Sequence, residues 1–226
     1  MDGVTGRKSY NQNCPIARGL DVLGDRWTLL ILRELLGGAR RYGDVRAALP
    51  GIATNLLADR LRELEEAGLV VRSELPPPVA RTVYTLSDEG WRKIPPVIRG
   101  VATFGLDLLE PSESALTPLN GFLAGILLGF DPTQVSDAAS YSVDIDGRRF
   151  GFGVTTDGLT AAANPPAVTV TATAADLITA RLGGTAAERK AALRRCKFEG
   201  SAAAIDAMRA AFRLAADPGL ASSNRG

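Results

Sequence analysis

The chain has 226 residues, a length typical of one large domain or two small ones. Hydrophobic residues make up 46% of it and charged residues 23%, which is ordinary for a folded globular protein and excludes wholesale disorder. The 26 Lys and Arg residues nearly balance the 25 Asp and Glu residues, so the net charge of +1 neither favours nor excludes a nucleic-acid partner.

The sequence contains no histidine and two cysteines, Cys14 and Cys196. Without histidine the chain cannot build Ser-His-Asp or Cys-His catalysis, a histidine general base or a histidine-ligated metal site. The two cysteines are far apart in sequence, which argues against a zinc knuckle or a disulfide scaffold, and no paired-carboxylate or phosphate-loop motif occurs. We therefore expect a protein that is not an enzyme and carries no metal or cofactor.

No segment suits a membrane span or a secretory signal. The N-terminus is polar and lacks the apolar core of a signal peptide. The apolar segment Leu29–Leu36 is interrupted by Arg33 and Glu34, and the uncharged segment 114–130 is shorter than 18 residues. We expect a cytoplasmic protein with reduced thiols and no membrane partner.

The first half of the chain predicts a winged helix-turn-helix. The predicted helices are Pro15–Gly24, Arg26–Leu36, Tyr42–Leu49 and Thr54–Ala67. Asp25 is expected to cap the second helix, Pro50-Gly51 to form the tight turn, and Gly68 to end the fourth helix in a left-handed conformation.

A two-stranded ribbon and a long helix follow. The predicted strands are Leu69–Ser73 and Arg81–Leu86, joined by the rigid proline-rich loop Leu75–Val79. Ser87 is expected to cap the helix Trp91–Leu109, which Pro95-Pro96 should kink or divide. Consecutive helices followed by a two-stranded ribbon are the element order of a winged helix.

A change in composition near residue 111 predicts a second domain. The segment Glu110–Ser114 is predicted to be a linker, so we expect domains at 1–110 and 111–226. The second half predicts an apolar helix at Leu119–Phe130 and a hairpin of Ser140–Ile145 and Arg148–Val154 around Asp146-Gly147. The other predicted elements are strands Gly158–Ala163, Ala167–Thr173 and Cys196–Glu199 and helices Thr173–Leu182, Ala186–Arg195 and Ala202–Ala215. The expected fold class is α+β, with an antiparallel sheet in the C-terminal domain.

A helix-turn-helix places its second helix in the major groove of DNA. On that helix Asn55 can pair with an adenine edge and Thr54 can contact a base or a phosphate. Arg60 and Arg62 can neutralise phosphates or hold the fold together through Asp59, Glu63 or Glu65. Each arginine can also be an ordinary solvated residue. The expected DNA-binding residues are Arg40, Arg41, Arg46, Thr54, Asn55, Asp59, Arg60, Arg72 and Arg81.

Five segments together resemble the HxlR family of winged-helix transcription regulators over about residues 10–108. They are Cys14-Pro15-Ile16, Gly24–Leu35, Leu49–Ile52, Arg60–Val70 and Tyr84–Gly90. The resemblance implies a homodimer on double-stranded operator DNA, with the terminal helices of this domain in the dimer interface. The family usually has Ser, a basic residue and Thr or Ser where this chain has Ala53, Asn55 and Ala58, so its operator preference does not carry over.

Cys14 occupies the position that oxidant-sensing members of this family use. The start of a helix and Arg18 one turn later both favour the thiolate. The alternative is a small buried packing residue. The predicted DNA-binding domain has no second cysteine, so a disulfide would have to join the Cys14 residues of two subunits or join Cys14 to Cys196.

The second half resembles the sterol-carrier-protein-2-like fold. The resemblance rests on Ala167–Ala172, Ala175-Asp176-Leu177, Gly183-Gly184, Phe198–Ser201 and the helix containing Met208–Phe212. It implies a cavity for a hydrophobic small molecule, whose expected lining residues are Phe122, Ile126, Phe150, Phe152, Met208 and Phe212. The alternative is that these six side chains fill a dry core.

Three functional hypotheses follow. The first is a homodimeric, DNA-binding transcription regulator that responds to a hydrophobic small molecule bound by residues 111–226. The second makes Cys14 the sensor of oxidants or electrophiles and the C-terminal half a dimerisation module. The third is a lipid-binding carrier whose winged helix binds other proteins.

Overall fold

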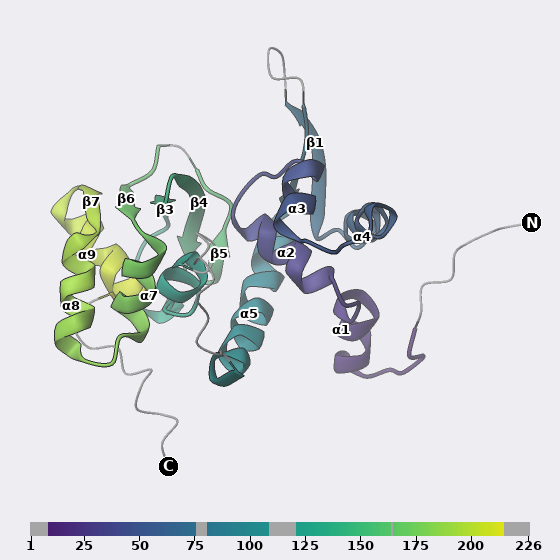
Figure 1. The fold of residues 1–226 in the computed structure, drawn as a ribbon, viewed down its shortest axis with the longest axis horizontal. Coiled ribbons are helices and arrows are strands. Elements are labelled where there is room, and N and C mark those ends of the chain that lie inside the picture. Colours follow the sequence, from purple (N-terminus) through teal and green to yellow (C-terminus); the bar gives the residue numbers. More distant parts are fainter. Residues whose placement is uncertain (1–8, 76–80, 109–120, 164, 215–226) are drawn as a thin grey trace, which may run out of the picture. The chain divides into compact units, whose positions relative to one another are not determined.

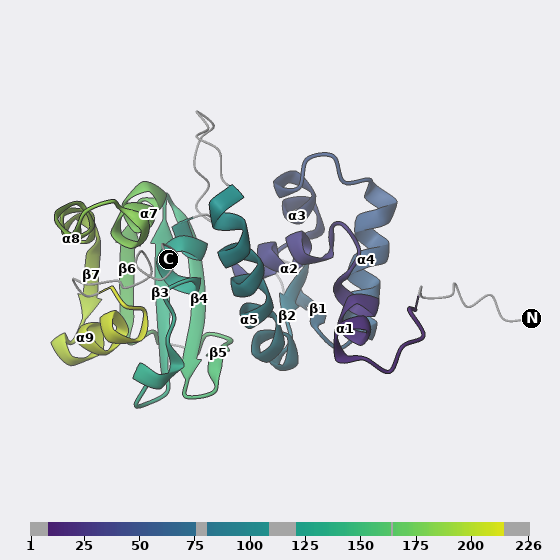
Figure 2. The same ribbon diagram turned by 90° about the horizontal axis from the view of Figure 1, so that it is seen from below.

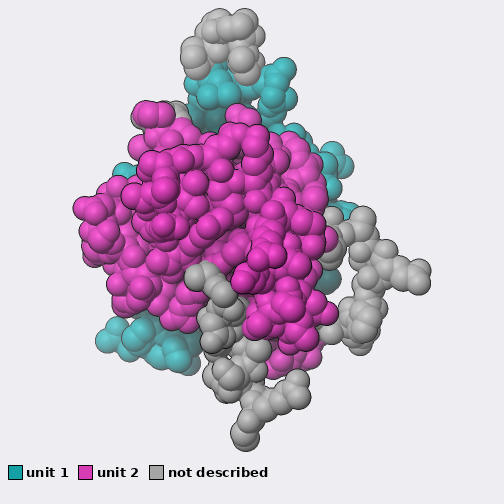
Figure 3. Space-filling view, turned by 90° about the vertical axis from the view of Figure 1, so that its left-hand side faces the viewer, with its two compact units in different colours: residues 1–90 teal, residues 91–226 magenta. Residues whose placement is uncertain are grey.

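The computed structural model describes residues 9–75, 81–108, 121–163 and 165–214. The tip of the proline-rich loop, the linker Glu110–Ser114 and residues 119–120 of the predicted apolar helix lie outside these ranges. Contacts divide the chain into unit 1, residues 1–90, and unit 2, residues 91–226 (Figure 3). This division falls inside a helix and earlier than the joint predicted near residue 111.

Unit 1 has the predicted winged-helix order (Figure 1). Its elements are α1 Pro15–Leu23, α2 Thr28–Leu36, α3 Tyr42–Ala48, α4 Thr54–Glu66, β1 Val70–Leu75 and β2 Arg81–Leu86. Strands β1 and β2 pair antiparallel, with Val70 opposite Leu86 and Arg72 opposite Tyr84. Gly68 has a φ of +71°, and the Leu69 amide donates to the Leu64 carbonyl oxygen at 3.0 Å, so α4 ends as predicted.

The start of α2 differs from the prediction. The helix begins at Thr28 and its N-cap residue is Trp27, so Asp25 is not the cap. The Asp25 backbone carbonyl accepts from the Thr28 amide at 3.0 Å, while its carboxylate pairs with the guanidinium of Arg60. The Asp25 side chain, which the local sequence predicts to cap α2, thus forms a tertiary ion pair instead.

Helix α5, Asp88–Gly105, is not divided at its prolines. The Ser87 hydroxyl accepts from the Gly90 amide at 2.9 Å, which confirms the predicted cap. Pro95 and Pro96 each lack an amide hydrogen, yet the helix continues through both and ends in the short 3-10 segment η1, Leu106–Leu108. Ile94, Pro95 and Ile98 are buried, so tertiary packing holds the helix where local hydrogen bonds are missing.

Unit 2 contains a five-stranded sheet with helices. The strands are β3 Ala139–Ile145, β4 Arg148–Thr155, β5 Gly158–Thr160, β6 Val168–Ala172 and β7 Lys197–Gly200. The helices are α7 Ala174–Leu182, α8 Ala186–Arg195 and α9 Ala202–Ala211. The strand order is β5-β4-β3-β6-β7 (Figure 2).

The sheet is antiparallel, as predicted, except at one pair. Strands β3 and β6 run parallel, with Tyr141 opposite Val168. Parallel neighbours need a crossover connection, and the chain provides one because it leaves β5 on one side of β3 and returns as β6 on its other side. The sheet is therefore mixed.

Two local features complete unit 2. Asp146 and Gly147 have φ angles of +51° and +80°, the left-handed pair that a two-residue type I′ hairpin requires. In the described part of the predicted apolar helix, residues 123–127 form the π-helical segment η2 instead of a regular helix, and the 3-10 segment η3, Pro132–Gln134, follows. Among the residues that the structure describes, no helix combines the length and the apolar character needed to cross a membrane.

Candidate nucleic-acid interface

Helix α4 has one buried and one exposed face at its N-terminal end. Leu57, Leu61 and Leu64 are at most 2% exposed and fix the helix in the core of unit 1. Thr54 and Asn55, at the beginning of the same helix, are exposed. A helix packed in this way presents the side chains of its first turn to solvent, as recognition helices do.

The connection into α4 is fixed by a side-chain hydrogen bond. The Tyr42 hydroxyl donates to the Thr54 backbone carbonyl at 2.6 Å, which joins α3 to the first residue of α4. The N-cap residue Ala53 offers no side-chain acceptor to the first amides of α4. A helix N-terminus without such a cap is able to accept an anionic group such as a phosphate.

Two of the predicted DNA-binding arginines are held by carboxylates inside unit 1. Arg40 lies 3.3 Å from Glu34 through Nη2, and its side chain is 17% exposed. Arg60 pairs with Asp25 and, at 2.6 Å, with Glu63, and its side chain is 18% exposed. These contacts favour the fold-holding role that the sequence left open for Arg60, and they give Arg40 a similar role.

The other predicted cations are more accessible. Arg41, Arg46, Arg72 and Arg81 are all exposed, the first two at and on α3 and the last two on the wing strands. The carboxylate of Asp59 forms an ion pair at 2.6 Å with Arg62, one turn later on α4. Of the predicted DNA-binding residues, the structure thus leaves Thr54, Asn55 and these four arginines exposed.

The base of the wing is anchored at Tyr84. The backbones of Arg40 and Tyr84 exchange two hydrogen bonds, of 2.8 and 3.0 Å. Burial raises the pKa of the Tyr84 hydroxyl above its usual value, and the nearby charge of Arg72 opposes that rise. Tyr84 therefore stays protonated at neutral pH and adds no negative charge beside the arginines of the wing.

Comparison with known proteins agrees with this geometry. The model of the HxlR-like helix-turn-helix family matches residues 22–113. The HTH-type transcriptional regulator sll1512 of Synechocystis is 40% identical over 108 residues, which cover 48% of this chain and 79% of that protein. The chain belongs to the HxlR-like helix-turn-helix family.

Two Bacillus subtilis proteins are further relatives of this HxlR-like chain. The HTH-type transcriptional regulator YvaP is 33% identical over 105 residues, covering 46% of this chain and 96% of YvaP. The HTH-type transcriptional regulator YodB is 36% identical over 81 residues, covering 35% of this chain and 72% of YodB. The solved structure of reduced YodB aligns over 45% of this chain and all of its own, with 30% identity and a TM-score of 0.38.

Cys14, the predicted redox residue, is the N-cap of α1 and is half-buried. The guanidinium of Arg18, which was predicted to favour the Cys14 thiolate, lies 3.8 Å from the carboxylate of Asp21 and forms an ion pair with it. Cys196 is buried in unit 2, and burial together with the charge of Asp176 raises its pKa to about 11. Cys196 therefore stays a neutral thiol at physiological pH.

The six side chains expected to line a hydrophobic cavity form a packed core instead. Each of them is at most 1% exposed. The rings of Phe122 and Phe150 stack with centroids 4.9 Å apart, and Phe152 meets Phe122 at 5.5 Å and Phe212 at 5.6 Å. Such edge and stacked contacts are those of a close-packed interior, so the structure favours the dry-core alternative.

Surface features that the sequence analysis did not identify lie on α5 and η1. Val97, Val101, Phe104 and Leu108 are exposed by 36, 51, 76 and 68%. Their spacing of four, three and four residues places them on one helical face, and that spacing was a signal available in the sequence. The described residues hold no group of three or more Cys, Asp or Glu side chains that could bind a metal ion.

Proposed function

We propose that the chain is a homodimeric transcription regulator that binds double-stranded operator DNA through unit 1. The observation that carries the proposal is the exposed start of α4, with Thr54 and Asn55, accompanied by exposed arginines on α3 and the wing. Asn55 would read an adenine edge, and the arginines would neutralise phosphates on either side. Arg40 and Arg60 are left out of this interface because carboxylates already bind them.

The test is fluorescence anisotropy with a labelled fragment from the gene's own upstream region at several salt concentrations. We expect tight binding that weakens steeply as salt increases, because phosphate contacts release counterions. Arg46→Gln and Arg72→Gln should each lower the slope of log affinity against log salt by about 1. Arg149→Gln, which removes an exposed cation of unit 2, is the matched control and should leave the slope unchanged. Affinity no greater than for random DNA, with no salt dependence, would instead favour the carrier hypothesis.

The exposed apolar stripe of α5 and η1 supports a dimer. An uninterrupted apolar face of this kind is usually covered by a partner. Helix α1 also exposes Ile16 and Leu20, by 73 and 46%. Both helices lie at the ends of the predicted domain 1–110, where the family resemblance implies the interface.

Phe104→Glu should convert the dimer to a monomer, because it places a charge in the centre of the apolar stripe. Light scattering coupled to size-exclusion chromatography measures the mass directly. Glu66→Gln, an exposed change on α4, should leave the mass at that of the native chain. A native chain that is monomeric at micromolar concentration would count against the dimer.

We also propose that residues 111–226 bind an effector that changes the affinity for DNA. The support is the resemblance to the sterol-carrier-protein-2-like fold, with which a mixed sheet packed against helices is compatible. An effector acts only through different affinities for the DNA-competent and DNA-incompetent states. Helix α5 begins in unit 1 and continues into unit 2, so it is the covalent route between them.

A second candidate is thiol-based sensing through Cys14, which the partial exposure of this N-cap residue favours. The relative YodB has been solved in a reduced form and after treatment with diamide, a thiol oxidant. Cys14→Ser should abolish any diamide-induced change in DNA affinity and leave an effector response intact. Cys196→Ser is the control, and because that thiol is buried it should alter neither response.

A further inference from the structure

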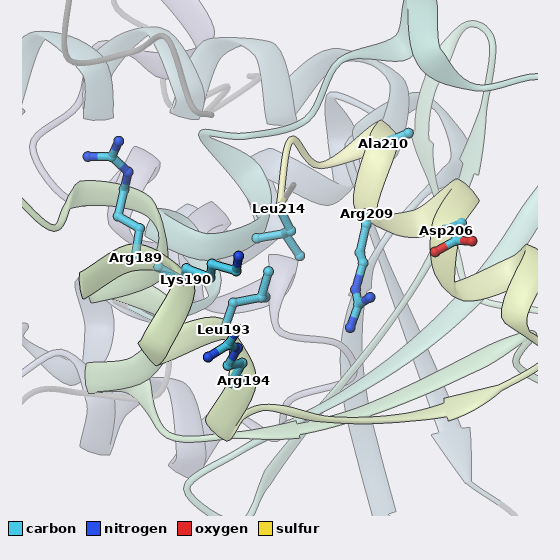
Figure 4. A pocket seen from close by; sticks show the side chains of 9 residues that line it. Arg189, Lys190, Leu193, Arg194, Asp206, Arg209, Ala210 and Leu214 are labelled. Atoms are coloured by element: carbon cyan, nitrogen blue, oxygen red, sulfur yellow. The ribbon is translucent and has the colours of Figure 1, made fainter. Parts of the chain in front are cut away.

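Unit 2 contains a cleft of about 500 Å³ between α8 and α9, with Leu214 among the residues that line it (Figure 4). This volume lies within the range of small-molecule sites in proteins. Lys190 and Leu193 extend from α8 and Arg209 extends from α9 into the space between the two helices. The cleft is separate from the aromatic core around Phe152.

The charge of the cleft is positive and largely uncompensated. Lys190 and Arg194, one turn apart on α8, make no ion pair with any described residue. The Nε atom of Arg209 is buried without a hydrogen-bond partner, and its guanidinium stacks 4.6 Å from the Phe198 ring. Asp206 is the one carboxylate among the lining residues, and it forms no ion pair with the described cations.

The neighbouring cations of unit 2 behave differently. Arg195, the next residue on α8, is paired with Asp176 at 2.7 Å, and Lys197 is paired with Glu199 at 2.6 Å. Arg189 also lines the cleft, but its Nη1 donates to the Gly183 carbonyl at 2.8 Å and so fixes the start of α8. Among the described residues, the cations beside the cleft are thus paired with acids, whereas Lys190 and Arg194 inside it are not.

A buried arginine is next in sequence to one of the residues that line the cleft. Arg181 follows the cleft residue Ala180, is 3% exposed and donates to the backbone carbonyl of Phe212. Burial, with the charges of Arg213 and Arg99, lowers the pKa of Arg181 to about 10, so it stays protonated at neutral pH.

The cleft also has an apolar part. Leu214 and Ala180 are 4 and 8% exposed, and Leu193 is half-buried beside them. A purely ionic ligand would leave this surface uncovered, and a purely apolar ligand would leave the cations unpaired. A ligand with an anionic group on an apolar body satisfies both.

We propose that the α8–α9 cleft binds an amphipathic organic phosphate, with its headgroup on Lys190, Arg194 and Arg209 and its apolar body on Leu193 and Leu214. A phosphate monoester carries close to two negative charges at neutral pH, which suits several unpaired cations better than a single carboxylate does. A DNA backbone fits less well because the cations lie in a cleft with an apolar end, whereas phosphates of a duplex need a continuous outer surface. The proposal identifies this cleft as the effector site and an organic phosphate as the effector. Its effect on DNA binding rests on the proposed function, whereas binding of the ligand does not.

The test is isothermal titration calorimetry of the full chain with decyl phosphate below its critical micelle concentration. We expect saturable one-to-one binding, with inorganic phosphate and decanol each at least about tenfold weaker. Lys190→Gln and Arg194→Gln should each weaken decyl phosphate binding about tenfold, because each removes a charged hydrogen bond. Both side chains are exposed, so the fold should tolerate these changes. Arg195→Gln, the adjacent cation outside the cleft, should bind like the native chain.

Three results would overturn the site. They are native-like affinity in Lys190→Gln and Arg194→Gln, equal binding of inorganic and decyl phosphate, and loss of DNA affinity in these variants without loss of decyl phosphate binding. The DNA titration, run with and without decyl phosphate, separates the two proposals. Operator binding without decyl phosphate binding refutes the cleft alone, and decyl phosphate binding without operator binding refutes the DNA-binding function alone.

Discussion

Phe152→Ala is expected to lower the free energy of unfolding of unit 2 by about 3–5 kcal/mol, the usual cost of removing a fully buried phenylalanine. Phe152 is 0% exposed, and its ring contacts those of Phe122, Tyr141 and Phe212. The truncation removes apolar area and leaves a cavity that close-packed rings cannot collapse to fill. Such a loss is a large share of the stability of an ordinary domain.

Urea unfolding followed by far-ultraviolet circular dichroism measures the change. The matched control is Phe198→Ala, which removes the same ring from β7 at a half-buried position and should cost much less. If the six aromatic and aliphatic residues lined an open ligand cavity instead of a core, Phe152→Ala would cost about as little as the control. The experiment therefore also decides between the two interpretations of these residues.

Glu34→Gln is expected to destabilise unit 1 by about 3 kcal/mol. The Glu34 side chain is 3% exposed and lies 3.1 Å from Arg33 and 3.3 Å from Arg40. Glutamine preserves the volume but removes the negative charge, so two poorly hydrated guanidinium groups lose their counter-charge. The loss of one partner from a buried ionic contact costs more than the intact pair contributes.

Both tryptophans, Trp27 and Trp91, lie in or directly after unit 1, so tryptophan fluorescence during urea unfolding reports on this region. Glu66→Gln on α4 is the control, because this exposed side chain should change stability by no more than about 0.5 kcal/mol. An equally small effect of Glu34→Gln would mean that water already solvates the two arginines. Arg40 would then be available to bind a phosphate, and it would return to the list of DNA contacts.

Features that depend on near neighbours in the chain could be predicted from local patterns. The spacing of Leu57, Leu61 and Leu64 fixed α4 and its buried face, and Gly68 fixed where the helix ends. Asp146-Gly147 fixed the hairpin, since few residues adopt two successive left-handed conformations. The ordered motifs of residues 10–108 were enough to indicate the family. The helix, its end and the hairpin can be predicted from a single sequence because each depends on interactions between residues that are close in the chain.

Features that depend on contacts between residues far apart in the chain could not be predicted in this way. Arg60 meets Asp25 across 35 positions, so the Asp25 carboxylate binds this guanidinium and does not cap α2. Packing around Ile94 and Ile98 carried α5 through two prolines that local rules treat as a break. The predicted cavity residues pack against one another, and Lys190, Arg194 and Arg209 from α8 and α9 line one cleft with Leu214. Charge pairing and cavities depend on which elements face each other, and no local pattern encodes that choice.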